Sequence, residues 1–481
     1  MNKLSKLFGR NFFFGIFAAI SIFIILVIFF KDSINNYFIG DDFTWLRWAS
    51  GSNASILIKN FYDSSGFFYR PIDKLLIFFA FKFFAYQPLG YHLISISLHY
   101  AISLLVLLMF NNIFKKKSLA FLGALFFALT PIHQQNIFWF STFSITLSSL
   151  FVLLSLVFYF LFKTKNNIFY LIASIFISLL AVFSYEGAAI TFLLIPLVDF
   201  LLSKKVWINL KFYIPYFLVS VLYLTLRTIA GSAGFSGDYN YNFVKLIPNF
   251  VGNFFGYIFM FLFGSNSISI YSLLRVSLKN YTIPISVIGL LCLFLLLLKR
   301  KKFYKFFQKY NLEVFGLYFA FVVLLPFLGL GNITDRYLYL SSFGFILTAL
   351  ALLDRYVLSK LKNSGYLIAY CLILIVSGVW FYKEFKQIEY HWTRASKITN
   401  NTVLYLKTNF PLLPKNSDLY FVNVPIKYGQ AYVFPVGLED AVWFVYKDNS
   451  IKVYQVNSFA EAKKPYVLEY GSNFEITKLE Q

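Results

Sequence analysis

The chain has 481 residues and a formal net charge of +22, yet only 13% of its residues are charged and 59% are hydrophobic. Soluble domains contain about 25% charged and about 45–50% apolar residues, so this composition excludes a soluble enzyme. It also excludes intrinsic disorder, which requires low hydrophobicity. Both cysteines, Cys292 and Cys371, lie in apolar runs, so we expect neither a disulfide framework nor a cysteine-based metal site.

Apolar runs of about 20 residues, enough to cross a bilayer, recur along the chain. The first, 11–30, is longer than the apolar part of a signal peptide and ends without a small-residue cleavage site, so we expect an uncleaved span. Ten further runs bring the prediction to eleven spans: 91–112, 118–132, 141–162, 168–184, 187–203, 212–230, 281–298, 313–331, 337–359 and 364–383.

The positions of Lys and Arg predict the orientation, because cytoplasmic loops are enriched in basic residues. With the N-terminus inside, the inner segments hold 20 basic and 3 acidic residues, whereas the outer segments before residue 383 hold 11 and 8. Residues 243–265 could cross, but the basic run 299–302 would then lie outside. We therefore expect 231–280 to be an outer excursion. The charge of +22 indicates topology rather than nucleic-acid binding.

Two segments flank the spans on the expected outer side. Residues 71–86 are apolar but carry three charged side chains, which favours an interfacial helix within a first outer loop over 31–90. Residues 391–481 are more polar and contain β-favouring runs, which predict a small α+β domain. These runs are 419–422, 442–446 and 451–454.

The predicted fold is mainly α. Residues 1–390 form a polytopic transmembrane helix bundle of about eleven spans, and residues 391–481 form a small extracytoplasmic α+β domain. We expect a plasma (inner) membrane location with a cytoplasmic N-terminus.

An acidic pair follows the first span, in the stretch Gly40-Asp41-Asp42-Phe43. Ionisable residues beside a membrane core are candidate functional residues, and two adjacent carboxylates can provide a general base and an orienting or metal-binding group. A helix N-cap before Phe43 explains the pair equally well.

Four further polar groups fall on the same outer side. Arg70 and Arg336 could bind a phosphate, since the guanidinium fork suits phosphate oxygens. Arg70 could instead contact lipid headgroups, and Arg336 could pair with Asp335 or Glu186. Glu186, between two spans with almost no loop, is either near a site or paired with an Arg. A lone interfacial His such as His133 is more often structural. No P-loop or Rossmann glycine pattern is present.

The chain resembles the polytopic, lipid-phosphate-sugar-dependent (GT-C) glycosyltransferases, especially the protein O-mannosyltransferases and the related transmembrane O-mannosyltransferases. The acidic pair after the first span is the main likeness. The chain departs from the family pattern at Gln135, where the family usually has an acid, and at Ser141-Thr142-Phe143-Ser144, which replaces a Gly-Arg-x-Asp-like stretch. Further likenesses are Tyr69-Arg70-Pro71, Pro88 to Leu93 with His92, Ala128 to His133, Glu186-Gly187, and Asp335 to Leu340 with Arg336 and Tyr337.

The resemblance implies a sugar transfer from a polyprenyl-phosphate donor to an extracytoplasmic hydroxyl on a protein, glycan or lipid, with inversion. It implies catalytic roles for Asp41, Asp42 and Glu186. Substrate binding falls to Arg70, Tyr69, His133, Arg336, Tyr337 and His92. Membrane lipids are expected partners and nucleic acid is not. A divalent metal is possible beside Asp41 and Asp42, but some branches of the family need none, and no metal ligand is predicted.

Three alternatives stay open. A lipid-linked saccharide flippase would need polar residues deep within several spans. An inactive scaffold would bind a partner through its tail. An envelope polymer ligase would share the architecture and move a whole glycan.

Overall fold

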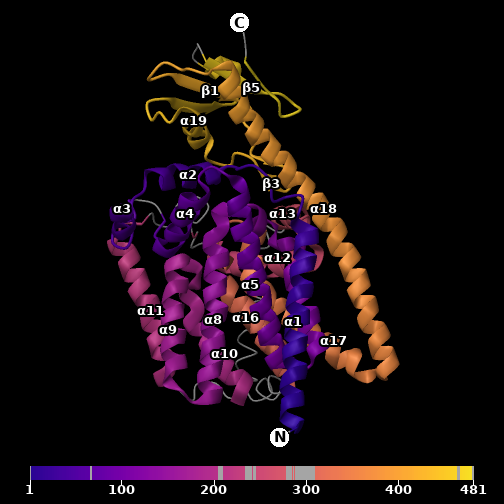
Figure 1. Cartoon of the computed structure of the whole chain (residues 1–481). Helices are drawn as coiled ribbons and strands as arrows, with labels where there is room; N and C mark the ends of the chain where they lie inside the picture. The colour runs from indigo at the N-terminus through magenta and orange to yellow at the C-terminus, as the bar shows by residue number, and fades with distance from the viewer. Residues whose placement is uncertain are drawn as a thin grey trace.

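The computed structural model describes residues 2–65, 68–203, 210–232, 241, 245–277, 284, 287, 309–462 and 466–478. Long helices run side by side and form a bundle, with the N-terminus at its lower end and a small sheet above its upper end (Figure 1). The bundle helices are α1 (Asn2–Phe30), α5 (Pro88–Phe114), α6 (Lys117–Leu129), α8 (Phe143–Lys165), α9 (Ile168–Ser184), α10 (Thr191–Ser203), α11 (Leu210–Ile229), α16 (Asn311–Leu328), α17 (Leu338–Tyr356) and α18 (Asn363–Asn409).

Eight helices of the described residues are long and apolar enough to cross a membrane, so the chain is a multi-pass membrane protein. Each predicted span that lies within the described residues falls on a bundle helix. Three of these helices, α6, α9 and α10, have only 13 to 17 residues. The predicted span 281–298 lies mostly outside the described residues, so the number eleven stays a prediction.

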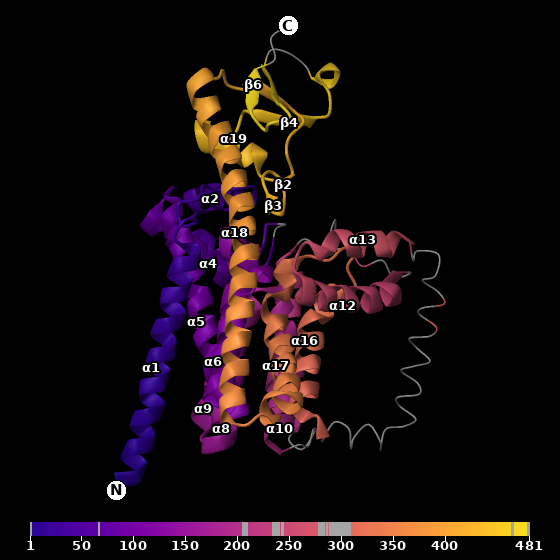
Figure 2. The ribbon, with the colours of Figure 1, turned by 90° about the vertical axis from the view of Figure 1, so that its right-hand side faces the viewer.

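The predicted outer excursion contains one of the eight apolar helices, α12 (Leu246–Phe263). Figure 2 shows α12 and the following helix α13 (Ser267–Ser277) running across the bundle axis near its upper end. This orientation agrees with an excursion rather than a crossing, although α12 has the length and hydropathy of a span.

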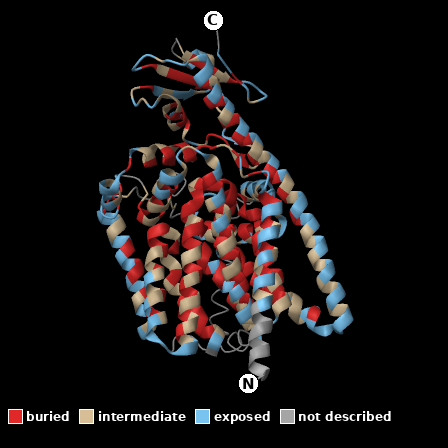
Figure 3. Cartoon of the chain, viewed as in Figure 1, coloured by how far each residue is buried: buried red, intermediate tan, exposed pale blue. Residues whose placement is uncertain are grey.

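Small residues and ion pairs hold the bundle together. Gly316 of α16 and Gly344 of α17 let the two backbones touch, since a Cβ at Gly344 would lie 2.3 Å from the Gly316 carbonyl oxygen. At the lower end, Lys163 pairs with Asp199 at 3.0 Å and Lys116 with Asp354 at 2.7 Å. Buried residues concentrate in the middle of the bundle, while α1, α11 and α18 carry many exposed residues (Figure 3).

Short helices and turns form a layer over the upper end of the bundle. The predicted interfacial helix is α4, which begins with Pro71 at its first position, where a missing N–H costs nothing. The members of this layer are α2 (Asp41–Gly51), α3 (Ala54–Lys59), α4 (Pro71–Phe84), α7 (Gln134–Phe138) and the 3-10 turns η1 (Pro131–His133), η2 (Phe140–Thr142), η3 (Glu186–Ile190) and η7 (Asp335–Tyr337).

The C-terminal part begins with α18, a single helix of 47 residues. The predicted boundary at residue 390 falls inside it, and the division into two domains stays a prediction. A four-stranded sheet of order β4-β1-β5-β6 follows, with β1 parallel to both neighbours and β6 antiparallel to β5. The remaining elements are η8 (Leu358–Lys360), β1 (Asp418–Val422), β2 (Lys427–Tyr428), β3 (Ala431–Tyr432), α19 (Leu438–Tyr446), β4 (Lys452–Val456), η9 (Phe459–Glu461), β5 (Tyr466–Tyr470) and β6 (Ile476–Lys478).

One predicted strand is wrong. Residues 442–446 favour a strand by composition but form the second half of α19. Gly437, with φ 84°, starts this helix, and Leu438, Ala441 and Val442 are buried at helical spacing. Strand propensity depends on context, and burial of this helical face decides the structure. The other two runs fall on β1 and β4 as predicted.

Candidate active site

The acidic pair lies in the first turn of α2, on the upper face of the bundle. Helix α2 begins at Asp41, and its N-cap residue is Gly40, with φ 45°. No side-chain hydrogen bond caps this end of the helix. The predicted helix start at Phe43, capped by an Asp, is therefore two residues late. Carboxylates in the first turn of a helix interact favourably with the helix dipole, but this interaction leaves their oxygens available to accept hydrogen bonds.

Asp42 is committed to hydrogen bonds within the protein. One carboxylate oxygen accepts the Ser141 backbone N–H at 3.1 Å and the Ser141 hydroxyl at 2.6 Å, and the other accepts the Ile39 N–H at 3.1 Å. Only 2% of Asp42 is exposed. Burial raises the pKa of Asp42 to about 8, although the hydrogen bonds from Ser141 and Ile39 act to lower it. The residue joins α2 to the start of α8.

Asp41 has the opposite environment. Its buried Oδ1 accepts no hydrogen bond from a described residue. Burial raises the pKa of Asp41 to about 6, the nearby charge of Arg336 opposes the rise, and Asp440 adds to it. A carboxylate with an unused oxygen and a pKa near neutrality is suited to accept a proton.

The turn η7 carries two predicted site residues, Arg336 and Tyr337, next to Asp335. Asp335 is 1% exposed, and its Oδ2 accepts the Gln134 side-chain amide at 2.7 Å and the Ser265 hydroxyl at 2.9 Å. Arg336, partly exposed, lies over the Tyr337 ring at 5.3 Å and is close enough to act on the charge of Asp41. The positive charge of Arg336 therefore favours the ionised form of Asp41.

Arg70 and Glu186 form a bidentate pair beside the start of α8. The Arg70 Nε and Nη2 donate to the two Glu186 oxygens at 2.7 and 2.6 Å, and Nη1 donates to the Ser144 hydroxyl at 3.3 Å. The guanidinium lies over the rings of Phe68 and Tyr185, at 4.1 and 4.6 Å. The internal pairing expected as one alternative for Glu186 is present. Arg70 makes this contact in a site only 5% exposed, rather than extending toward lipid headgroups.

Two ionisable residues of α4 lie next to this pair, and the sequence had not singled them out as site residues. Asp73 is fully buried, neither of its oxygens accepts a hydrogen bond from a described residue, and burial raises its pKa to about 7. Lys74 donates to the Asn60 side chain at 2.9 Å, and burial lowers its pKa to about 8. With Arg70, they place three buried ionisable side chains at the start of α4.

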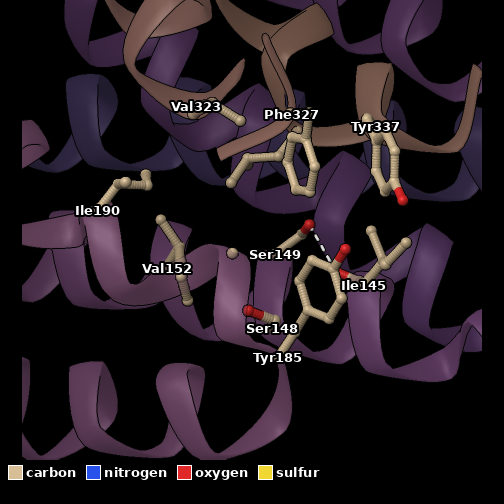
Figure 4. A pocket seen from close by; sticks show the side chains of 12 residues that line it. Ile145, Ser148, Ser149, Val152, Tyr185, Ile190, Val323, Phe327 and Tyr337 are labelled. Atoms are coloured by element: carbon tan, nitrogen blue, oxygen red, sulfur yellow. Dashed lines mark hydrogen bonds between the residues drawn. The ribbon is translucent and has the colours of Figure 1, made fainter. Parts of the chain in front are cut away.

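A small apolar pocket lies between α8, α16, η3 and η7. Figure 4 shows Tyr185, Phe327 and Tyr337 around it, and the Phe327 and Tyr337 rings stack at 3.9 Å. Gly187 leaves space here, because a Cβ would lie 2.7 Å from the Tyr185 ring. The pocket thus adjoins both the Arg70–Glu186 pair and the turn that carries Arg336.

Three predicted substrate-binding residues are buried and make contacts within the protein. His133 is fully buried and its Nε2 lies 2.9 Å from the Ser342 hydroxyl. His92 Nε2 lies 2.9 Å from the Asn36 carbonyl, and the Tyr69 hydroxyl donates to the Phe61 carbonyl at 2.7 Å. Each of these contacts connects two segments of the chain.

Two serines that the sequence presented only as departures from the family pattern organise the site. Ser141 binds Asp42, and Ser144, one turn later, binds Arg70. Gln134 likewise carries no catalytic signal in the sequence, yet it holds Asp335. Within the residues that the structure describes, no group of three or more His, Cys, Asp or Glu side chains is arranged to hold a metal ion.

No protein-family model and no curated protein sequence matches the chain. Among solved structures, it is similar to the crystal structure of the Archaeoglobus fulgidus oligosaccharyltransferase in the apo form, with a TM-score of 0.45 and 13% sequence identity. The match covers 92% of this chain and 65% of that chain. The chain therefore spans just under two thirds of that enzyme's length. A likeness this distant leaves the function to be argued from the residues of this chain.

Proposed function

We propose that the protein is a membrane glycosyltransferase that moves a sugar from a polyprenyl-phosphate donor to a hydroxyl group at the outer face, with inversion. One observation carries the proposal: the unused buried oxygen of Asp41 lies near the charge of Arg336 at the upper end of a multi-pass bundle. A base and a phosphate-binding cation are the two groups that this transfer needs.

The reaction starts with the acceptor hydroxyl. Asp41 takes its proton, the hydroxyl oxygen forms a bond with the anomeric carbon, and the bond from that carbon to the phosphate oxygen breaks. The electron pair of the broken bond goes to the lipid phosphate, whose charge Arg336 stabilises. Because a phosphate is already a good leaving group, no general acid is required. Attack opposite the leaving group inverts the anomeric centre.

Other residues of the site have supporting roles in this proposal. Asp42 holds Asp41 and α2 against the start of α8 through Ser141. Glu186 balances the charge of Arg70, and this pair forms one wall of the site. The apolar pocket beside Tyr337 takes the first part of the lipid chain, since its lining excludes water and accepts hydrocarbon.

The test uses the full chain in lipid nanodiscs with labelled polyprenyl-phosphate sugars and with peptide, glycan and lipid acceptors. We expect a new glycosidic bond of inverted configuration and release of polyprenyl phosphate. Asp41→Asn, which keeps size and polarity, is the matched variant and should bind donor without transfer. Full activity of Asp41→Asn would refute the assignment of the base.

Two other outcomes would identify the alternatives. Movement of lipid-linked sugar across a liposome membrane without a new bond would identify a flippase. Transfer of an intact glycan from a lipid pyrophosphate, with no activity on single sugars, would identify a polymer ligase.

A further inference from the structure

The hairpin of β2 and β3 in the C-terminal part reaches down to the bundle. Its tip is Gly429-Gln430, between Tyr428 and Ala431. Gly429 has φ 58°, and a Cβ there would lie 2.7 Å from the ring of His391 on α18. Only glycine fits this position without strain, so the tip is seated closely against α18.

The side chain of Gln430 uses both ends of its amide at this contact. Its Oε1 accepts a hydrogen bond from the Gln134 amide at 2.8 Å, and its Nε2 donates to the Asn266 side chain. Gln134 belongs to α7, and Asn266 lies in the turn between α12 and α13. The Gln430 side chain therefore bridges α7 and the turn between α12 and α13, at residues that are 132 positions apart in sequence.

The same two elements hold Asp335. Gln134 Nε2 donates to Asp335 Oδ2 at 2.7 Å, and the Ser265 hydroxyl, next to Asn266, donates to the same oxygen at 2.9 Å. The contacts close a ring: Gln430 to Gln134, to Asp335, to the Ser265-Asn266 turn, and back to Gln430. Asp335 therefore accepts hydrogen bonds from Gln134 and from Ser265, and Gln430 connects the two elements that carry these donors.

The amide of Gln134 has no spare capacity. Its two N–H groups serve Asp335 and Gln430, and its Oε1 accepts the indole N–H of Trp392 at 2.9 Å. Gln134 is only 3% exposed. If Gln430 is removed, one buried N–H of Gln134 loses its partner, and the amide is held less firmly against Asp335.

We infer that Gln430 is a positioning residue through which the C-terminal part fixes Asp335 and, next to it, Arg336. This inference rests on the proposed function for the role of Arg336 in transfer, but the positioning itself is a structural property. It gives the C-terminal part a place in the catalytic unit: transfer requires the hairpin tip to be docked.

The experiment compares Gln430→Ala with Gln455→Ala in the full chain. Gln455 is an exposed residue of β4, which belongs to the four-stranded sheet and not to the hairpin, so it offers the same chemical change at another place in the C-terminal part. Hydrogen exchange of the Tyr337 amide, which donates to the Thr334 carbonyl in η7, needs no substrate and reports on the turn directly. We expect Gln430→Ala to increase this exchange about tenfold, the effect of losing about one hydrogen bond, and Gln455→Ala to leave it unchanged.

Kinetics provide the second measurement. We expect Gln430→Ala to lower kcat about tenfold with little change in KM for the donor, since misplaced groups affect the transition state most. If Gln430 acts through Gln134, the double variant Gln134→Ala/Gln430→Ala should be no slower than Gln134→Ala alone.

The outcomes separate this inference from the proposed function. If the Tyr337 amide exchanges faster in Gln430→Ala while the wild-type protein transfers no sugar, the result would support positioning and refute the transferase. Transfer by the wild type with unchanged exchange and kcat in Gln430→Ala would refute positioning alone. Additive losses in the double variant would show that Gln430 acts by another route and would also overturn the inference.

Discussion

Asp41 and Asp42 are neighbours in the chain, but their carboxylates do different things. The oxygens of Asp42 accept hydrogen bonds from Ser141 and Ile39, whereas Asp41 keeps a buried oxygen that accepts none from the described residues. Helix geometry produces the difference, since consecutive side chains point about 100° apart. Asp42 is hydrogen-bonded to Ser141 of η2, whereas Asp41 is influenced by the charge of Arg336.

Substitution of the two aspartates should separate catalysis from stability. We expect Asp41→Asn to lower the transfer rate by about 10²–10⁴-fold, the range for loss of a general base, with an unchanged melting temperature. Asp42→Asn should instead lower the free energy of unfolding by about 1–3 kcal/mol, because its NH₂ group would face donors from Ser141 or Ile39. Rate assays and thermal unfolding in nanodiscs test both. The reverse pattern would make Asp42 the base.

The pH dependence of transfer identifies the same carboxylate independently. Asp41 accepts a proton only when ionised, and its pKa is raised to about 6. The value of kcat/KM should therefore rise with pH through a midpoint near 6 and stay constant above pH 7. A midpoint near 8 would match Asp42 instead. Asp41→Asn serves as the control, because its residual activity should lose the acidic limb.

The Arg70–Glu186 pair should show strong coupling in stability. Glu186→Gln leaves the Arg70 charge in a site only 5% exposed, so we expect a loss of about 3 kcal/mol in the free energy of unfolding. Arg70→Met/Glu186→Gln should lose less than the sum of the single variants, with a coupling energy of about 1–3 kcal/mol. Unfolding curves of the three variants test this. Normal stability of Glu186→Gln combined with loss of transfer would give Glu186 a direct catalytic role.

Gly437 offers a test of the contact between the C-terminal part and the acidic pair. A Cβ at Gly437 would lie 2.2 Å from the Gly40 carbonyl oxygen and 3.2 Å from the Asp41 nitrogen. Gly437→Ala should displace the start of α2 and lower kcat by about 10- to 100-fold, the effect of a small misplacement of a reacting group. Gly471→Ala is the matched control, because its Cβ would meet nothing closer than 3.8 Å. Equal activity of both variants would contradict a dependence of Asp41 on this contact.

The orientation in the membrane also remains to be tested. The predicted topology places the inner loops, with 20 basic residues, in the cytoplasm and the C-terminal part outside. A reporter fused after residue 481 should be active only in an extracytoplasmic compartment, and one fused after Lys116, in the loop between α5 and α6, only in the cytoplasm. Any other combination would contradict the orientation.

The sequence predicted the helices of the bundle well because apolar runs of that length have few alternatives in a membrane. It also predicted that Asp41, Glu186 and Arg336 lie at the same end of the bundle, because the distribution of basic residues among the loops assigned each segment to one side of the membrane. It failed at 442–446, where strand propensity was outweighed by burial of a helical face. It also gave no sign that α18 continues beyond residue 390, because the composition changes there while the helix does not end.

The roles within the candidate site could not be predicted, because they depend on contacts between distant segments. Arg70 and Glu186 are 116 residues apart and Gln134 and Gln430 are 296 apart, so no local pattern relates them. The difference between Asp41 and Asp42 depends on where Ser141 lies in space. Ser141 itself looked like a departure from a family pattern rather than a partner.

Helix α18 connects the lower end of the bundle to the sheet without a break. Its 47 residues correspond to about 70 Å of helix, more than twice the roughly 30 Å of a hydrocarbon core. The lower part of α18 is apolar enough to cross a membrane, and the hairpin packs against its upper part at His391, so a change in the tilt of α18 would move the hairpin tip with Gln430. We therefore expect the thickness of the surrounding bilayer to affect the position of Gln430, and membranes of different lipid length to change the rate of the proposed transfer.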